Sequence, residues 1–296
     1  MTTVETIARI GRIPYINAIP FYHRLDEDGG MPLEYYQHYP TKINLAMRRG
    51  KIAMAPISSL EYLNHQKNYL LLPNLAIGAR DFSGSVILFS KERIEGLGKT
   101  TIALTRESLS SAVLLRILLK FKYKFKNRFL VMESDIKKML AKCQAGLVIG
   151  DHALFYKPDT FVYKYDLSEL WWNWTGKPFC FAVWAVHRDF AEENPEEVAR
   201  FCKRLRQNRD RNLSNIENLI KDALGMNFLD PDFPKVFGYL FNLSYGFDQS
   251  MQEGLQLFYR LAHRLGFSPS PGKLEFFDLK SQETLSKKVK GHRGHS

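Results

Sequence analysis

Asn17 is the first residue whose type and position could do chemistry. Apolar residues from Ile7 to Ile16 predict a buried first strand, and Pro20 predicts a turn or a helix start just beyond it. An amide at the carboxyl end of the first strand of an α/β chain occupies a ligand position, because such folds bind ligands outside their strand ends. The alternative is a turn in which the Asn17 side chain hydrogen-bonds its own backbone.

Two short segments rich in serine and glycine have the composition of anion sites. In Asp81–Ser85, the small residues let backbone amides approach a ligand closely. Thr105–Ser111 precedes an apolar helical stretch, so its hydroxyls and free amides belong to a helix N-terminus, which is a common anion site. A plain polar turn and an ordinary serine cap are the alternatives for these two segments.

A strand-end acid is the next candidate. Asp151 follows the buried stretch Leu147–Gly150, so it is predicted to lie at the edge of a cleft. There it could orient a substrate hydroxyl, or act as an acid or a base. The alternative is that Asp151 only caps the helix that begins near Ala153.

The most unusual composition lies in Tyr165–Phe179. Trp171, Trp172 and Trp174 are followed by Thr175 and Gly176. Aromatic side chains offer large contact areas at little entropic cost, and they line small-ligand pockets well. The alternative is a packed loop that closes the second domain.

The composition is that of a globular protein with two domains, at 296 residues and 45% hydrophobic content. No secretory leader and no bilayer-spanning apolar run is visible. Cys143, Cys180 and Cys202 are widely spaced and odd in number, which favours core thiols in a reducing cytoplasm. Phosphate-loop, dinucleotide, hydrolase and zinc motifs are missing from the sequence, so we expect no cofactor and no metal.

The net charge of +11 favours an anionic partner. Basic and aromatic residues alternate in Lys120–Arg128, a pattern that nucleic-acid-binding segments also show. No DNA-, RNA- or zinc-binding signature accompanies it, which favours a solvated helix end or a lysine-protected edge strand. We therefore expect a small anionic substrate, and neither nucleic acid nor a membrane as partner; the oligomeric state stays open.

Strand and helix patterns alternate, which predicts an α/β fold. Domain I, residues 1–87 plus 188–296, and an inserted domain II, residues 88–187, are predicted to enclose a ligand cleft. Val86–Ser90 and Phe179–Val186 are the two predicted hinge strands. The other predicted strands are Ile7–Ile16, Ile52–Pro56, Leu70–Ile77, Thr101–Thr105, Phe129–Met132 and Ala145–Gly150. The predicted helices are Tyr39–Arg49, one capped by Ser58–Ser59 that begins near Leu60, Ala112–Lys120, Ile136–Lys142, Glu196–Glu217, Pro234–Asn242, Ser250–Leu265 and Asp278–Val289.

Together these motifs resemble the chorismate dehydratase family of menaquinone biosynthesis (MqnA), over residues from about 9 to 265. The segments that carry the resemblance are Ile13–Pro20, Gly50–Tyr62, Ser83–Ser85, Ser108–Ser111 with Leu114–Leu118, Ile149–Leu154, and Asp166–Trp171 with Trp184. At Ile13–Pro14 and Arg106–Glu107, the chain differs from the sequence that is more common in the family. The resemblance implies a periplasmic-binding-protein type 2 fold and a cytoplasmic enzyme of the futalosine pathway. That enzyme dehydrates chorismate to 3-[(1-carboxyvinyl)oxy]benzoate.

The resemblance also implies roles for the candidate residues. Asn17 would donate a hydrogen bond to developing charge or to the leaving hydroxyl. Asp151 is a candidate base, although the substrate's own enolpyruvyl carboxylate is the favoured one. The remaining predicted contacts to chorismate come from Ser58, Ser85, Ser108, Ser110, Ser111, Trp171, Thr175 and Gly176.

Two other functions remain open at this stage. One is a non-catalytic cytoplasmic binding protein for a small carboxylate, which would return chorismate unchanged. The other is the sister enzyme 1,4-dihydroxy-6-naphthoate synthase (MqnD), which shares the fold and uses a cleft histidine. His152 is the only residue that we identify as a candidate for such a histidine.

Overall fold

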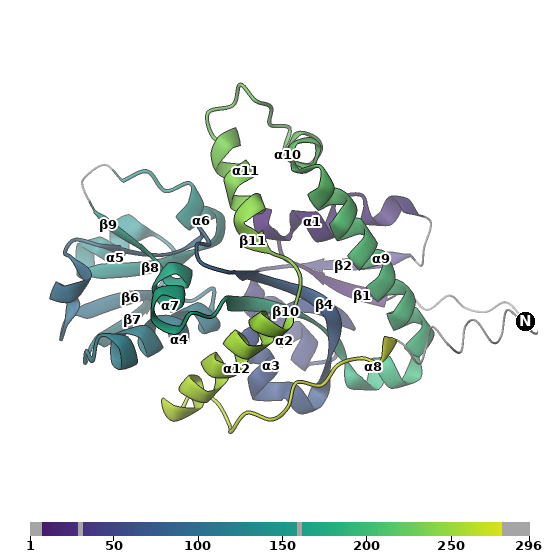
Figure 1. Cartoon of the computed structure of the whole chain (residues 1–296), viewed down its shortest axis with the longest axis horizontal. Coiled ribbons are helices and arrows are strands. Elements are labelled where there is room, and N and C mark those ends of the chain that lie inside the picture. Colours follow the sequence, from purple (N-terminus) through teal and green to yellow (C-terminus); the bar gives the residue numbers. More distant parts are fainter. Residues whose placement is uncertain (1–7, 29–31, 159–161, 280–296) are drawn as a thin grey trace, which may run out of the picture.

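Two β-sheets with helices packed around them make up the computed structural model, which describes residues 8–28, 32–158 and 162–279 (Figure 1). The first sheet has the strand order β11 (Leu243–Ser244), β4 (Tyr69–Ala79), β10 (Phe179–His187), β3 (Met54–Ser58), β1 (Ala8–Arg12) and β2 (Leu33–Gln37). The second has the order β7 (Arg128–Met132), β6 (Thr101–Thr105), β8 (Ala145–Ile149), β5 (Val86–Ser90) and β9 (Tyr163–Asp166). We call the described parts of residues 8–79 and 179–279 the first lobe, and those of 86–175 the second lobe.

Both sheets are mixed. In the first, β1 runs parallel to β2 and β3, whereas β10 is antiparallel to β3 and β4. In the second, β6 is parallel to β7 and β8, whereas β5 is antiparallel to β8 and β9. The central strands β3, β5 and β8 are buried along their whole length, as near-continuous apolar runs require when helices or loops cover both faces.

Helices connect and cover these strands. Those of the first lobe are α1 (Ile19–Tyr22), α2 (Pro40–Arg48), α3 (Ser59–His65), α8 (Arg188–Glu193), α9 (Pro195–Ser214), α10 (Ile216–Leu224), α11 (Phe233–Asn242) and α12 (Gln249–Arg264). Those of the second lobe are α4 (Leu109–Ile117), α5 (Ile136–Lys142), α6 (Gly150–Leu154) and α7 (Leu167–Thr175). Short 3-10 turns are η1 (Ile16–Ala18), η2 (Leu25–Asp28), η3 (Gln66–Asn68) and η4 (Ile94–Leu97), and η5 (Leu118–Lys122) is a π-helical turn.

The chain crosses between the lobes twice, as two predicted hinge strands require. The crossings themselves, however, do not lie in the strands that were predicted to be the hinges. The segment 80–85 joins β4 to β5, and the segment 176–178 joins α7 to β10. The predicted hinge strands therefore lie just after the crossings, each wholly within one sheet. Because β10 pairs with β3 and β4, residues 179–187 belong to the first sheet, whereas the predicted boundary assigns them to the inserted domain.

The first predicted strand is too long. β1 ends at Arg12, and Asn17 lies in the η1 turn, beyond the strand assigned by hydrogen bonding. Ile13, Tyr15 and Ile16 are buried, which gives the same apolar pattern as a strand. Tyr15 and Ile16, however, contact the second lobe, and the η1 turn also packs against α11. Strands β2, β9 and β11 and the helices α7, α8 and α10 were not predicted, and most of the predicted helix Asp278–Val289 lies outside the described residues.

Candidate active site

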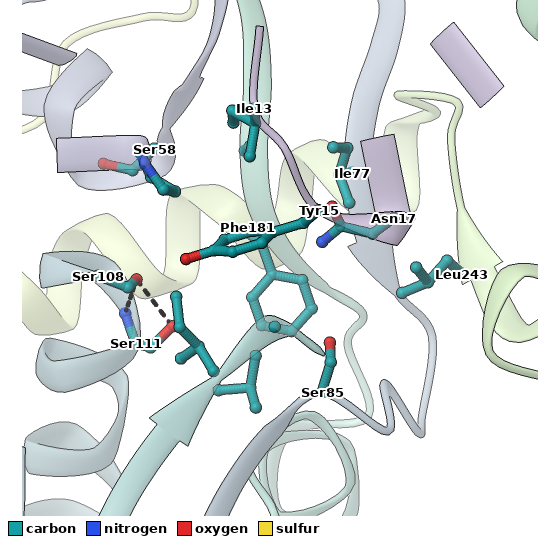
Figure 2. Close-up of a pocket in the computed structure, with 15 residues that line it drawn as sticks. Ile13, Tyr15, Asn17, Ser58, Ile77, Ser85, Ser108, Ser111, Phe181 and Leu243 are labelled. Atoms are coloured by element: carbon teal, nitrogen blue, oxygen red, sulfur yellow. Dashed lines mark hydrogen bonds between the residues drawn. The ribbon is translucent and has the colours of Figure 1, made fainter. Parts of the chain in front are cut away.

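A pocket lies between the two lobes, at the carboxyl ends of β3 and β8 and the start of β5 (Figure 2). It encloses about 610 Å³ of empty space, part of it open to solvent, which is within the usual range for small-ligand sites. Five predicted site residues contribute to its wall: Asn17, Ser58, Ser85, Ser108 and Ser111. The other lining residues are Ile13, Tyr15, Pro40, Ile77, Val86, Ile149, Gly150, Phe181, Ala182 and Leu243.

Ser58 presents a hydroxyl proton to this pocket. As predicted, Ser58 is the N-cap of α3, and its Oγ accepts a 3.3 Å hydrogen bond from the backbone amide of Glu61. The same oxygen accepts a 3.0 Å bond from Asn44 Nδ2, and the Ser58 amide donates to Asn44 Oδ1 at 3.1 Å. Since a hydroxyl oxygen has two acceptor sites, these bonds leave the O–H to donate.

A second donor comes from the N-terminus of α4 in the other lobe. Ser108 is its N-cap: its Oγ accepts a 3.2 Å bond from the Ser111 amide and donates to Ser111 Oγ at 2.9 Å (dashed in Figure 2). The Ser111 hydroxyl is then free to donate into the pocket. Ser110 does not line the pocket; its Oγ accepts a 3.0 Å bond from the Leu60 amide and so joins α4 to α3 of the first lobe.

The third group of donors gathers around Tyr239 on α11. Its hydroxyl donates a 2.9 Å hydrogen bond to Ser85 Oγ, and the Asn17 side chain also hydrogen-bonds Tyr239. Burial raises the pKa of Tyr239, and the bonds to Ser85 and Asn17 oppose that shift. In Figure 2 the Asn17 amide points toward the Tyr15 ring. Among the described residues, buried Asn17 Oδ1 finds no partner. An unsatisfied amide at a pocket wall is a ligand-contact position.

Tyr15 spans the pocket from the first lobe to the second. Its hydroxyl donates a 3.0 Å bond to Glu107 Oε2, and its ring lies against Gly150. Gly150 has a φ of +63°, and a Cβ there would approach three ring atoms to 3.3 Å. Burial, and then the charge of Glu107, raise the pKa of Tyr15. Tyr15 and Glu107 were not among the predicted site residues. The glycine at the end of the buried stretch Leu147–Gly150, which indicates a close approach to the backbone, was the signal that could have predicted the Tyr15 contact.

Asp151 lies behind this wall and not in it. It is not the cap of a helix near Ala153, because α6 begins at Gly150 and Asp151 lies in its first turn. Its Oδ1 accepts a 3.3 Å bond from the Ile16 amide, which gives another contact between the lobes. Burial raises the pKa of Asp151, and the Ile16 bond opposes that shift. Asp151 lines a separate outer groove of about 1080 Å³ that shares Ile13 and Tyr15 with the pocket.

The tryptophan segment forms helix α7, away from the pocket lining. Asp166 caps its N-terminus, and Gly176 ends it with a φ of +65°. Trp171 is fully buried, with its ring centroid 5.7 Å from that of Phe179. Thr175 Oγ1 donates to the Trp171 carbonyl at 2.8 Å. The structure therefore does not bring Trp171, Thr175 and Gly176 together with the five residues of the pocket wall.

The pocket is uncharged, since none of its lining residues has a side chain that is ionised at neutral pH, and its polar side chains are set among apolar ones. Negative charge there would be stabilised by hydroxyls, by amides and by the N-termini of α3 and α4, whose caps are Ser58 and Ser108. The described residues contain no group of three His, Cys, Asp or Glu side chains that could bind a metal ion. Across the same residues, we find no helix with the length and apolar character needed to cross a membrane.

Comparison with known proteins decides the family. A family model described as menaquinone biosynthesis matches residues 8–264. The chain belongs to this family. The chorismate dehydratase of Thermus thermophilus is 30% identical to it over 278 residues, which cover 88% of this chain and 96% of that protein.

Solved structures show the fold that this family member adopts. Protein AF1704 from Archaeoglobus fulgidus matches with a TM-score of 0.69 at 19% identity, covering 87% of this chain and 97% of that one. The periplasmic aliphatic sulphonate binding protein SsuA from Escherichia coli matches with a TM-score of 0.62 at 15% identity, covering 93% and 96%. The predicted fold, two α/β units of the periplasmic-binding-protein type, is confirmed.

Proposed function

We propose that this chain is a chorismate dehydratase that converts chorismate to 3-[(1-carboxyvinyl)oxy]benzoate and water, in the futalosine pathway of menaquinone biosynthesis. The observation that carries the proposal is the similarity to the Thermus enzyme over nearly the whole of both chains. The pocket supports it chemically, because its serine hydroxyls and amides, set at two helix N-termini, suit a substrate with two carboxylates.

The first requirement of the reaction is to hold the dianion. In our proposal, the Ser58 hydroxyl from the first lobe and the Ser111 hydroxyl from the second donate to the carboxylates. Ser85 Oγ is oriented by Tyr239 and provides a third donor. Neutral donors fixed before the substrate arrives stabilise charge in the transition state without reorganising during the reaction.

The second requirement is to remove the proton from the ring carbon that bears the ether. That carbon is vinylogous to the ring carboxylate, so breaking the C–H bond gives a delocalised anion. Loss of hydroxide from the neighbouring carbon then makes the ring aromatic, and the proton and hydroxide together form the released water. Asn17, at the pocket wall, donates to the developing charge or to the leaving hydroxyl.

We propose that the enolpyruvyl carboxylate of the substrate accepts this proton. Asp151 is the other candidate, but its Oδ1 is bonded to the Ile16 amide and the residue lines the outer groove. This placement supports a role for Asp151 in holding the lobes together. The ring of Tyr15, which covers the pocket between the lobes, keeps water away from the anion.

The proposed reaction is a dehydration without net oxidation or reduction, and in our proposal it needs no cofactor. We also propose that the enzyme acts in the cytoplasm. The support is that Cys143, Cys180 and Cys202 are buried free thiols, which suit a reducing compartment.

The decisive experiment mixes the purified protein with chorismate, follows the loss of the diene absorbance and identifies the product by mass. Formation of the aromatic product, one water lighter than chorismate, would support the dehydratase. Tight binding of unchanged chorismate would favour a non-catalytic binding protein. Absence of both would overturn the choice of substrate. The sister 1,4-dihydroxy-6-naphthoate synthase is the less favoured alternative, because His152 is exposed and does not line the pocket.

A further inference from the structure

A second hollow lies at the far end of α4, where the second lobe meets the segment after α12. We call it the basic groove; it encloses about 500 Å³ of space, part of it open to solvent. Its cations are Arg116, Lys120 and Lys126, and none of the described residues that line it is acidic. The rest of its wall consists of Leu119, Phe125, Asn127, Phe129, Leu265 and Phe267.

Arg116 is the centre of the basic groove. Its guanidinium carbon lies 4.1 Å from the ring centroid of Phe129 in the second lobe and 5.3 Å from that of Phe267 in the first. The side chain is half-buried, and within the described chain it forms no ion pair. Burial lowers the pKa of Arg116, and no neighbouring charge opposes that shift. Arg116 is therefore a half-buried cation with two aromatic contacts and no counterion among the described residues, which leaves its N–H groups able to bind an anion.

The backbone around the basic groove is fixed in unusual conformations. The α4 helix continues into the π-helical turn Leu118–Lys122, a rare form that is frequent at functional sites. Lys124 follows with a φ of +60°. Asn127 Nδ2 then donates to the carbonyls of Leu97, at 2.5 Å, and of Thr100, at 3.3 Å, which pins the loop to the second lobe.

We propose that the basic groove is a second anion site, which binds the carboxylate or phosphate group of a small ligand through Arg116, Lys120 and Lys126. Both phenyl rings contact the guanidinium. The fork geometry of its N–H donors matches two oxygens of a carboxylate or phosphate. Leu119, Phe125 and Leu265 provide apolar surface for the body of the ligand.

This site is distinct from the pocket between the lobes. Ser108 caps the N-terminus of α4 at that pocket, whereas Arg116 lies near the other end of the helix, roughly 12 Å further along its axis. The proposal therefore does not depend on the reaction in the pocket. The experiment must measure binding in the basic groove itself, because carboxylates are also expected to bind in the pocket between the lobes.

Lysine footprinting gives that direct signal. The full chain is acetylated with a limiting amine-reactive ester, in sodium phosphate, in sodium benzoate and in sodium chloride of the same ionic strength. Mass spectrometry then measures the labelling rates of Lys120 and Lys126, and exposed Lys221 on α10 is the internal reference. We expect phosphate, benzoate or both to protect the two groove lysines and to leave Lys221 unchanged. Protection by phosphate alone would indicate that the groove binds phosphate groups, and protection by benzoate alone would indicate that it binds carboxylates.

Arg116→Met tests the residue that carries the proposal, and Arg264→Met is its matched control. Arg264 is exposed and lies 4.9 Å above the Phe121 ring, so the control removes an arginine–aromatic contact outside the basic groove. Loss of a charge-assisted hydrogen-bonded pair is expected to raise the probe concentration for half-protection about tenfold in Arg116→Met. The control should behave as the unaltered chain.

Two results would overturn the proposal. One is absence of protection in the unaltered chain with both salts, and the other is undiminished protection in Arg116→Met. If Arg116→Met does not fold, Arg116→Lys replaces it, because lysine keeps the charge but not the planar pair of donors. Protection of Arg116→Lys at the same probe concentration as the unaltered chain would then reject the bidentate site.

Discussion

The hydroxyl of Tyr15 in the first lobe donates a 3.0 Å hydrogen bond to Glu107 Oε2 in the second lobe, across the pocket. Two more bonds join the lobes nearby: the Ile16 amide to Asp151 Oδ1, and the Leu60 amide to Ser110 Oγ. All three connect an element at the pocket wall with the loop or helix that faces it. The pocket is thus enclosed by contacts between the lobes, and its enclosure can be tested residue by residue.

Removing the Tyr15 hydroxyl should weaken catalysis without removing the ring. We expect Tyr15→Phe to lower kcat/KM for chorismate about tenfold, since a hydrogen bond to a charged group contributes roughly 1.5 kcal/mol. Arg106→Gln is the control, because Arg106 neighbours Glu107 but pairs with exposed Glu133. Steady-state kinetics measure both variants. An unchanged kcat/KM in Tyr15→Phe would show that the bond to Glu107 does not contribute.

A methyl group at Gly150 should affect the pocket as well as the backbone. Gly150 and Gly176 have φ values of +63° and +65°, so alanine causes similar backbone strain at either position. Only at Gly150 would the new Cβ meet a neighbour, the Tyr15 ring at 3.3 Å. We expect both variants to lose about 1 kcal/mol of unfolding free energy, because alanine is disfavoured at positive φ, but only Gly150→Ala to lose most of its activity. Equal activities in the two variants would argue against a close Tyr15–Gly150 contact.

The donor role of Asn17 predicts a loss in turnover. Asn17→Asp keeps the shape but replaces the amide donor with a carboxylate oxygen, so we expect kcat to fall about 100- to 1000-fold. Asn218→Asp is the same change at an exposed position on α10 and should leave kcat unaltered. Stopped-flow single-turnover assays separate the chemical step from binding. A rise in KM alone, with kcat retained, would assign Asn17 to binding only.

The position of Asp151 predicts a pH-dependent effect on stability. Burial raises the pKa of Asp151 in the folded chain, whereas in the unfolded chain it titrates near 3.8. Between these two pKa values the folded state binds more protons than the unfolded one, so stability decreases as pH rises. Asp151→Asn removes this titration. The unfolding free energy of the wild type, relative to the variant, should therefore fall as pH rises from below 3.8 toward neutrality.

The same variant separates a structural role from proton transfer. In Asp151→Asn, the carbonyl oxygen of the introduced side-chain amide can still accept from the Ile16 amide. The variant should therefore keep turnover within about threefold of the wild type. Chorismate turnover at neutral pH measures this. Near-complete loss of turnover, in a variant whose circular dichroism is unchanged, would restore Asp151 as the base.

Local signals in the sequence predicted the elements that depend on local interactions. Thr101–Thr105 and Ile136–Lys142 have the predicted bounds, and Ser58 caps its helix as expected. The signals for α7 were also present, since Asp166 and Gly176 are typical N-terminal and C-terminal helix residues. The density of tryptophan drew the interpretation toward a ligand-binding loop.

Contacts between the lobes could not be predicted in this way. Tyr15 and Ile16 are buried like strand residues, but their partners Glu107 and Asp151 are 92 and 135 residues away in sequence. The pattern of apolar residues records that a side chain is buried and not which segment buries it. The same limit applies to Ser85, whose partner Tyr239 comes from a helix after the second crossing.

The short segment from Tyr15 to Asn17 combines two tasks that proteins often separate. Tyr15 and Ile16 make bonds to the opposite lobe, and Asn17, the next residue, is at the pocket wall. Because Asn17, Ser58 and Ser111 come from different lobes, the pocket has its full set of donors only in the arrangement in which the lobes are in contact. Any opening of the cleft would therefore separate these donors as well as admit water.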